Sequence, residues 1–103
     1  MDIQLKKGAL DICVLHILNK QDSYGYDITE KIAKFIDIGE GSIYPILRKL
    51  KDDGCLTTYL KESVDGPPRK YYKITERGQA KYKMYLEDWN QFSNSINKFL
   101  EEK

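Results

Sequence analysis

Two short clusters of cations and hydroxyl groups carry the chemistry that this sequence suggests. They consist of Ser42, Tyr44, Arg48 and Lys49, and then of Arg69 and Lys70. Hydroxyl groups and cations bind phosphate oxygens, and an arginine can also bond the edge of a guanine. Taken alone, the first cluster also fits a solvated helix face, and the second fits charges that protect an edge strand from aggregation. Together they favour binding to a nucleic acid.

Residues suited to acid–base, redox or metal chemistry are few. His16 is the single histidine and lies in an apolar segment with no matched nucleophile. The acidic pairs at 52–53 and 87–88 are adjacent in sequence, so their members point in different directions on a helix. Cys13 and Cys55 form no zinc set with one histidine and are expected to be packed thiols, since a redox switch needs an exposed, acidic thiol. We predict a non-enzyme without metal or cofactor.

A helix must position the first cluster. Its expected buried stripe, at spacings of four and three, is Ile43, Leu47 and Leu50. We expect this helix to begin near Gly39 or Glu40 and to end at Gly54, which can adopt a left-handed cap. Pro45 would then lie beyond the first turn, so the carbonyl of Gly41 would lose its donor and the helix would bend or begin loosely.

A hairpin must position the second cluster. Apolar and polar residues alternate around 56–61 and again at 71–74, which predicts two strands. Residues 62–68 separate them and contain the turn signal Asp65-Gly66 and two prolines that should stop pairing. We therefore expect a hairpin with a long tip.

Two further helices are expected earlier in the sequence than these elements. Residues 5–18 are too densely apolar for a helix that meets one surface, so this helix should have two neighbours. Asp22 or Ser23 can cap a second helix that runs to about Phe35. Its expected inward face consists of Ile28, Ile32, Phe35 and Ile36.

The C-terminal segment predicts one long helix, capped by Thr75 and weakened early by Gly78. Its apolar positions step by three and four residues, as in the seam of a coiled coil: Tyr82, Tyr85, Trp89, Phe92, Ile96 and Phe99. A helix of about 27 residues is about 40 Å long, more than this small body can cover. The excess predicts a homodimer that pairs through this seam.

Trp89 in the middle of the seam allows two interpretations. It can be a buried residue of the dimer core, or it can be a plate on which a flat aromatic or cationic compound stacks. Bulky rings across a symmetric interface favour a slot, and Phe92 and Ile96 would line the same slot.

These elements predict an α+β fold that is mostly α: a winged helix-turn-helix of three helices and a two-stranded β-wing over residues 1–75, followed by a dimerisation helix over residues 76–103. The net charge is only +1, with a small basic excess in the middle of the chain, so DNA affinity would come more easily from two copies. No apolar run approaches the length of a membrane span, and no leader peptide is recognisable, so we expect a cytoplasmic protein without membrane partners.

Three strings resemble the PadR family of bacterial transcriptional regulators: Ser-Tyr-Gly-Tyr-Asp-Ile at 23–28, Gly-Ser-Ile-Tyr-Pro-Ile-Leu-Arg-Lys-Leu at 41–50 and Arg-Lys-Tyr-Tyr-Lys-Ile-Thr at 69–75. The resemblance covers about residues 5–78. It implies a homodimer that represses transcription, often of efflux or detoxification genes, and that releases DNA when a small molecule binds.

The short tail resembles the smaller PadR subfamily, which includes multidrug-sensing repressors. That resemblance implies that Trp89 stacks on planar drugs in a pore between the subunits. The other pore residues that it implies are Leu5, Gly8, Ile12, Leu15, Leu86, Phe92 and Ile96. The chain departs from the subfamily at Ser93, where the drug sensor has an acidic group, and at Gly39, where a hydroxyl cap is more common.

We therefore predict a sequence-specific DNA-binding regulator, a homodimeric repressor on a near-palindromic operator, relieved by a planar aromatic effector. The alternative is a winged-helix protein-interaction module that binds no DNA. The predicted DNA contacts are Ser42, Tyr44, Pro45, Arg48, Lys49, Arg69 and Lys70.

Overall fold

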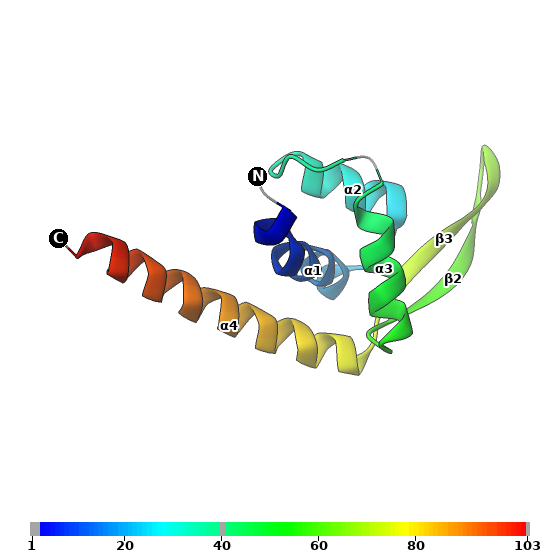
Figure 1. Cartoon of the computed structure of the whole chain (residues 1–103). Coiled ribbons are helices and arrows are strands. Elements are labelled where there is room, and N and C mark those ends of the chain that lie inside the picture. Colours follow the sequence, from blue (N-terminus) through cyan, green and yellow to red (C-terminus); the bar gives the residue numbers. More distant parts are fainter. Residues whose placement is uncertain (1–2, 40, 103) are drawn as a thin grey trace.

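A small body of helices and a twisted sheet carries one long helix that projects from it (Figure 1). The computed structural model describes residues 3–39 and 41–102, with side chains from Gly8 onward. Its elements are α1 (Ile3–Lys20), β1 (Ser23–Tyr24), α2 (Gly25–Ala33), α3 (Ile43–Asp52), β2 (Leu56–Ser63), β3 (Gly66–Ile74) and α4 (Glu76–Glu101). This order confirms the predicted mostly helical α+β fold with a winged helix-turn-helix and a long C-terminal helix.

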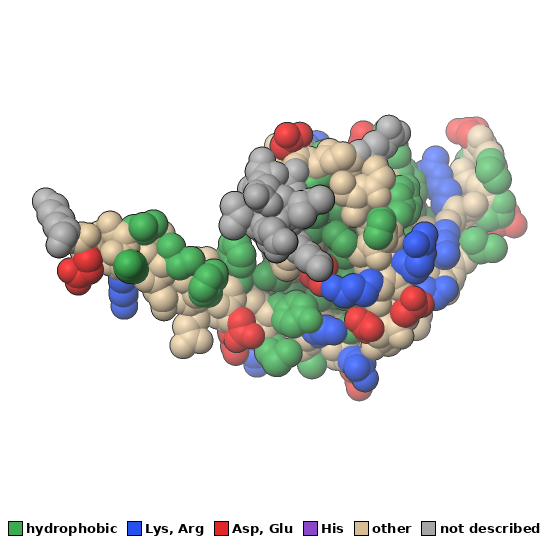
Figure 2. Space-filling view, in the orientation of Figure 1, with side chains coloured by type: hydrophobic (Ala, Val, Ile, Leu, Met, Phe, Trp, Pro, Cys, Tyr) green, Lys and Arg blue, Asp and Glu red, His purple; other side chains and the backbone are tan. Residues whose placement is uncertain are grey.

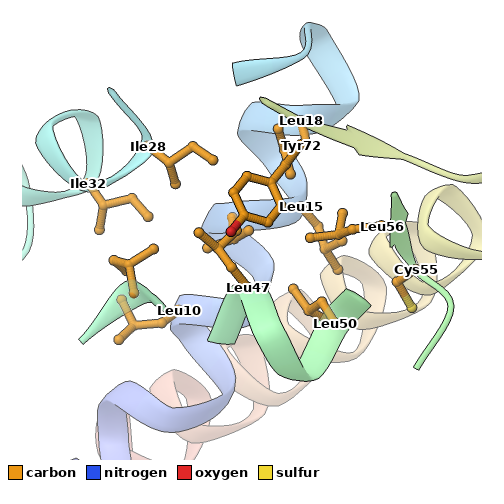
Figure 3. Close-up of a cluster of buried hydrophobic side chains, with 12 residues drawn as sticks. Leu10, Leu15, Leu18, Ile28, Ile32, Leu47, Leu50, Cys55, Leu56 and Tyr72 are labelled. Carbon is orange, nitrogen blue, oxygen red and sulfur yellow. The ribbon is translucent and has the colours of Figure 1, made fainter. Parts of the chain in front are cut away.

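The core lies where α1, α2 and α3 meet the sheet (Figure 3). Its larger members include Leu10, Leu15, Leu18, Ile28, Ile32, Ile43, Leu47, Leu50, Leu56 and Tyr72. The stripe of α3 is fully buried, as predicted, and each such side chain contributes about 1.5–3 kcal/mol by leaving water. Packing of α3 therefore depends on the chain's own core.

The predicted start of α3 is wrong. The helix begins at Ile43, three or four residues later than expected, and Glu40 lies outside the described residues. Pro45 is consequently the third helical residue, where no backbone amide has an intrahelical partner. The proline therefore takes no hydrogen bond from the helix, and the expected bend has no cause. Gly54 has a φ of +80° just after the helix, which confirms the left-handed cap.

The sheet has three strands in the order β1-β3-β2, all antiparallel. The sequence predicted two of them and missed β1, in which Ser23 pairs with Tyr72 and Tyr24 pairs with Tyr71. The predicted capping of α2 by Asp22 or Ser23 is therefore wrong. Tyr24 precedes α2 without a side-chain capping bond, and the backbone of Ser23 and Tyr24 pairs with β3.

The wing is paired almost to its end, so the predicted long tip is also wrong. Ser63 lies opposite Gly66, leaving a two-residue turn, and the register shifts between Lys61 and Ser63. This irregularity faces the part of β3 that holds Pro67 and Pro68. Prolines lack an amide hydrogen, and a bulge is one of the places where a sheet tolerates them.

α2 ends at Ala33, before the predicted Phe35. Ile28 and Ile32 are buried as expected, and Ile36 packs partly against the core. Phe35 is 90% exposed, because the chain tightens after the helix and the amide of Phe35 bonds the carbonyl of Ile32 at 3.0 Å. The prediction that Phe35 faces inward is wrong.

α4 divides into a packed beginning and a projecting end. The Thr75 hydroxyl accepts a hydrogen bond from the amide of Gly78 at 3.1 Å, which confirms the predicted cap. Gly78 is buried against the carbonyl of Cys55, where a Cβ would collide, so close packing explains the glycine that the sequence marked as a weak spot. None of the helices in the described residues is long and apolar enough to cross a membrane.

Candidate nucleic-acid interface and ligand slot

The exposed face of α3 presents the first predicted cluster. Ser42, Tyr44, Pro45 and Arg48 are all solvent-exposed at the beginning and middle of this helix. The ring of Tyr44 packs directly over Gly25, where a Cβ would lie 2.7 Å from the ring, so the glycine leaves the room that this tyrosine needs. Figure 2 shows Lys and Arg side chains over α3 and the adjoining strands. Hydroxyl and guanidinium groups on a free helix face suit phosphate and base contacts.

Lys49 differs from the rest of the cluster because it has a partner within the chain. Its Nζ lies 2.8 Å from Oδ2 of Asp11 in α1. The Asp11 side chain is 6% exposed, whereas that of Lys49 is 54% exposed. The hydrogen bond to Asp11 raises the pKa of Lys49, against the opposing effect of burial. A phosphate contact by Lys49 would have to compete with this ion pair.

The two predicted wing cations lie on opposite faces of β3. Lys70 shares a face with Tyr72, whose ring enters the core beside α3, and its Nζ is 5.8 Å from the centre of that ring. Burial raises the pKa of Tyr72, with Tyr44 adding to the rise and Arg48 opposing it. Lys70 therefore continues the surface of α3, while Arg69 projects from the other side of the sheet.

Packed tyrosine rings on that other side were missed by the sequence predictions. The ring centre of Tyr71 lies 5.6 Å from that of Tyr24 and 5.7 Å from that of Tyr59. Arg69 lies 4.7 Å over the ring of Tyr24, and Lys61 lies 5.1 Å over Tyr71. Such contacts are worth about 0.5–1 kcal/mol each at exposed sites. They stiffen the base of the wing. The available signal was that Tyr59 and Tyr71 both fall on the polar face of the two predicted strands.

A pocket of about 530 Å³ lies where α1, α3 and α4 meet. Its walls are Gly8, Asp11, Ile12, Lys49, Tyr85, Asp88, Trp89 and Phe92. It brings together four residues of the predicted effector slot: Gly8, Ile12, Trp89 and Phe92. The sequence did not predict that the Asp11–Lys49 ion pair lines the same pocket, because these residues are 38 positions apart.

Other predicted slot residues lie elsewhere. Leu15 is fully buried in the core of its own protomer, so its assignment to a pore is corrected. Leu86 lines a second, larger pocket of about 890 Å³ between α1, α2 and α4. Ile96 lies farther along α4 and is exposed, and the side chain of Leu5 lies outside the described residues.

The surroundings of His16 and the two cysteines favour structural roles for these residues. Nδ1 of His16 lies 2.6 Å from the Tyr82 hydroxyl, which links α1 to α4. Both cysteines are free thiols; Cys55 is buried, and burial raises the pKa of Cys13, the opposite of what a reactive thiolate needs. Within residues 3–39 and 41–102, no group of three or more histidines, cysteines and acids could hold a metal ion.

The projecting part of α4 exposes a row of large apolar side chains, visible along the helix in Figure 2. They are Trp89, Phe92, Ile96, Phe99 and Leu100. Tyr85 and Tyr82, one and two turns earlier on the seam, pack partly against the core. The predicted dimer-interface residues therefore form two groups, one covered by the chain's own body and one exposed.

A family model described as "Transcriptional regulator PadR-like family" matches residues 14–84, which include α2, α3 and the wing. The chain belongs to the PadR-like family of transcriptional regulators. This family consists of non-enzymatic DNA-binding regulators, so the chain is a DNA-binding regulator and the predicted lack of enzymatic activity is confirmed. A winged helix without DNA binding is correspondingly disfavoured.

Solved structures agree with this assignment. A PadR-like transcriptional regulator from Bacillus cereus is 35% identical, with a TM-score of 0.85 over 97% of this chain and 99% of its own. A protein from Streptococcus mutans is 36% identical, with a TM-score of 0.85 over 92% of this chain and 89% of its own. The similarity includes the long C-terminal helix, so the projecting α4 is part of the shared architecture.

Two curated relatives differ in how much of their length this PadR-like chain spans. An uncharacterised protein from Lysinibacillus sphaericus is 29% identical over 92% of this chain and 91% of its own length. The negative transcriptional regulator PadR of Bacillus subtilis is 34% identical over 79% of this chain but only 44% of its own length.

Proposed function

We propose that this PadR-like protein is a homodimeric repressor that binds a near-palindromic operator and releases it when a planar aromatic molecule enters the slot beside Trp89. The exposed apolar row on α4 is the observation that carries the proposal. Each α3 would enter the major groove of one half-site, and the wings would flank it along the backbone.

The row on α4 supports pairing with a second copy. Phe92, Phe99 and Leu100 are each more than 60% exposed, so the chain's own body leaves most of their apolar surface in water. Covering such side chains is worth about 1.5–3 kcal/mol apiece. Two copies of one seam can cover each other about a two-fold axis, since the same surface serves both partners.

The two-fold axis has a consequence for DNA. A dimer places two copies of α3 about one helical turn apart on a two-fold operator, and two weakly basic protomers together bind better than one. The Bacillus subtilis relative is named a negative regulator, which favours repression over activation for this chain.

α4 also supports an effector site between the protomers. Trp89 is 44% exposed and borders the pocket with Ile12 and Phe92. In the dimer the pocket would open onto the seam, where an indole ring can stack on a flat aromatic ring. A ligand there would alter the spacing of the two α3 helices.

Matched variants test the dimer and its DNA binding together. Ile96→Asp places a charge on the seam, and Asn97→Asp places the same charge one position away. We expect Ile96→Asp to sediment as a monomer and to lose binding to an operator obtained by unbiased DNA selection, while Asn97→Asp keeps both. If Ile96→Asp remains dimeric, or if no operator can be selected with the intact chain, the proposal is wrong.

Quenching of Trp89 fluorescence by planar dyes tests the slot separately. Because Trp89 is the single tryptophan, the signal reports this position alone. We expect saturable quenching by the dimer. Intact dimers whose fluorescence is unaffected by planar dyes would reduce Trp89 to a packing residue and remove the effector from the proposal.

A further inference from the structure

The pocket beside Trp89 contains a charged pair that reaches the DNA-reading helix. Asp11 on α1 and Lys49 on α3 both line it, and their side chains meet at 2.8 Å. Lys49 directly follows Arg48, one of the exposed cations of α3. A ligand in this pocket would therefore touch a group that is bonded to the recognition helix.

The two partners of the pair differ in their freedom. The side chain of Asp11 is only 6% exposed, and a buried carboxylate must keep a cation or hydrogen-bond donor close by. The side chain of Lys49 is 54% exposed, and its ammonium can return to water at little cost. A second cation in the pocket could thus replace Lys49 at Asp11, whereas the buried Asp11 side chain cannot turn to solvent.

We propose that the Asp11–Lys49 ion pair is a ligand-sensitive tether: a planar ligand that carries a protonated amine takes the Asp11 carboxylate, Lys49 is released, and α3 loses its polar attachment to α1. The proposal rests on the slot put forward above and adds the chemical class of its ligand and the route to the DNA-reading surface. Asp11 would supply the acidic partner in the pocket.

Release of the tether lowers DNA affinity because the position of α3 against α1 then depends on its apolar stripe, without this polar contact between the two helices. That stripe fixes the depth of the helix in the core. The ion pair holds the C-terminal half of the helix against α1. Linkage requires that the effect be reciprocal, so bound DNA must weaken amine binding by the same factor. A neutral ligand of the same shape can fill the slot but cannot break the pair.

Two probes of equal shape test the charge requirement: 2-naphthylmethylamine, which is protonated at pH 7, and 2-naphthylmethanol, which is neutral. Calorimetry on the intact wild-type protein should give about tenfold tighter binding of the amine, the value of one charged hydrogen bond. Asp11→Asn should make the two affinities equal. Asp88→Asn is the matched control, because Asp88 lines the same pocket but is exposed and forms no ion pair among the described residues, and it should keep most of the preference.

Operator affinity at matched occupancy of the slot tests the link to α3. In the wild type the amine should weaken operator binding several-fold more than the alcohol does, within the range of about 5–150-fold that is typical of coupled sites. Lys49→Met should bind the amine more tightly than the wild type, since the competing cation is gone, and its operator affinity should no longer distinguish the two probes. Lys51→Met, the same change on the same helix, should behave as the wild type.

The outcomes separate this inference from the slot on which it rests. Equal binding of both probes by the wild type, or an amine preference that survives Asp11→Asn, overturns the tether, even where Trp89→Ala abolishes binding of both probes and so upholds the slot. If Trp89→Ala leaves both affinities unchanged, the slot is wrong and the tether falls with it. The double variant Asp11→Asn/Lys49→Met removes both charges, so it serves as a folded reference should Asp11→Asn alone be unstable.

Discussion

α3 and α4 carry apolar stripes of the same kind, with steps of three and four residues, but the molecule treats them in opposite ways. Ile43, Leu47 and Leu50 of α3 are completely buried by the chain's own core. Trp89, Phe92 and the residues beyond them on α4 remain exposed. Spacing therefore specifies that a face will be covered, and chain geometry decides whether the cover comes from the same protomer or from another molecule.

The largest expected effect lies on the covered stripe. Leu47→Ala should lower the free energy of unfolding by about 2–5 kcal/mol, because it leaves a cavity in a core that cannot collapse fully. Phe99→Ala on the exposed stripe is the counterpart. It should leave the unfolding of the monomeric Ile96→Asp background unchanged within about 0.5 kcal/mol. Urea denaturation of both variants in that background measures the difference.

A comparable loss of stability in the two variants would break the contrast between the helices. It would mean that the end of α4 packs against its own body in solution. In that case the distal seam would no longer need a partner, and the basis for a dimer through Phe99 would disappear.

The packed beginning of α4 gives the next prediction. Gly78→Ala places a methyl group against the carbonyl of Cys55 and the side chain of Ile74, and overpacking of this kind costs about 1–3 kcal/mol. Helix propensity alone predicts the opposite sign, a gain of about 1 kcal/mol. Gly8→Ala is the control, since a Cβ there meets nothing within 4 Å. Thermal unfolding should show a lower Tm for Gly78→Ala and no decrease for Gly8→Ala.

The order of elements, the stripe of α3 and the caps at Gly54 and Thr75 could be predicted because each depends on residues within a few positions of one another. The strand β1 could not, since two residues have no periodicity and Ser23 finds its partner, Tyr72, only through the fold. Phe35 was misassigned because a three-four pattern does not reveal where a helix stops.

The residues of the candidate site show the same difference between local features, which could be predicted, and long-range contacts, which could not. Trp89 and the exposed residues of α3 were visible in local spacing. The tether between Asp11 and Lys49 was not, because it links α1 to α3 across 38 residues, and a lone cation in a basic string looks like a phosphate contact. Long-range ion pairs of this kind leave no mark in a single sequence.

The cap of α4 yields a smaller effect. Thr75→Ala removes the hydroxyl that accepts from the amide of Gly78 and donates to the carbonyl of Gly54 at 2.7 Å. The expected cost is about 1 kcal/mol in the free energy of unfolding. Thr75→Ser keeps both bonds and should restore most of the stability. If the alanine and serine variants are equally stable, packing rather than capping holds the beginning of α4.

The smallest effects distinguish the two faces of the wing and extend the contrast between covered and free surfaces. Lys70 lies on the face shared with α3, so Lys70→Ala should weaken operator binding several-fold and reduce the salt slope of log K by about 1, as expected for one lost phosphate contact. Arg69 stacks on Tyr24 on the opposite face. Arg69→Ala should cost about 0.5–1 kcal/mol of stability and change the salt slope less.

Gel shifts at several salt concentrations, combined with urea denaturation, separate the two roles of the wing cations. Lys83→Ala, on the exposed side of α4 away from the wing, removes one positive charge without touching either face and corrects for net charge alone. A larger salt effect at Arg69 than at Lys70 would place the outer face of the sheet on the DNA. The packed tyrosine rings would then support a phosphate-binding arginine, and Lys70 would pack with Tyr72 against the core.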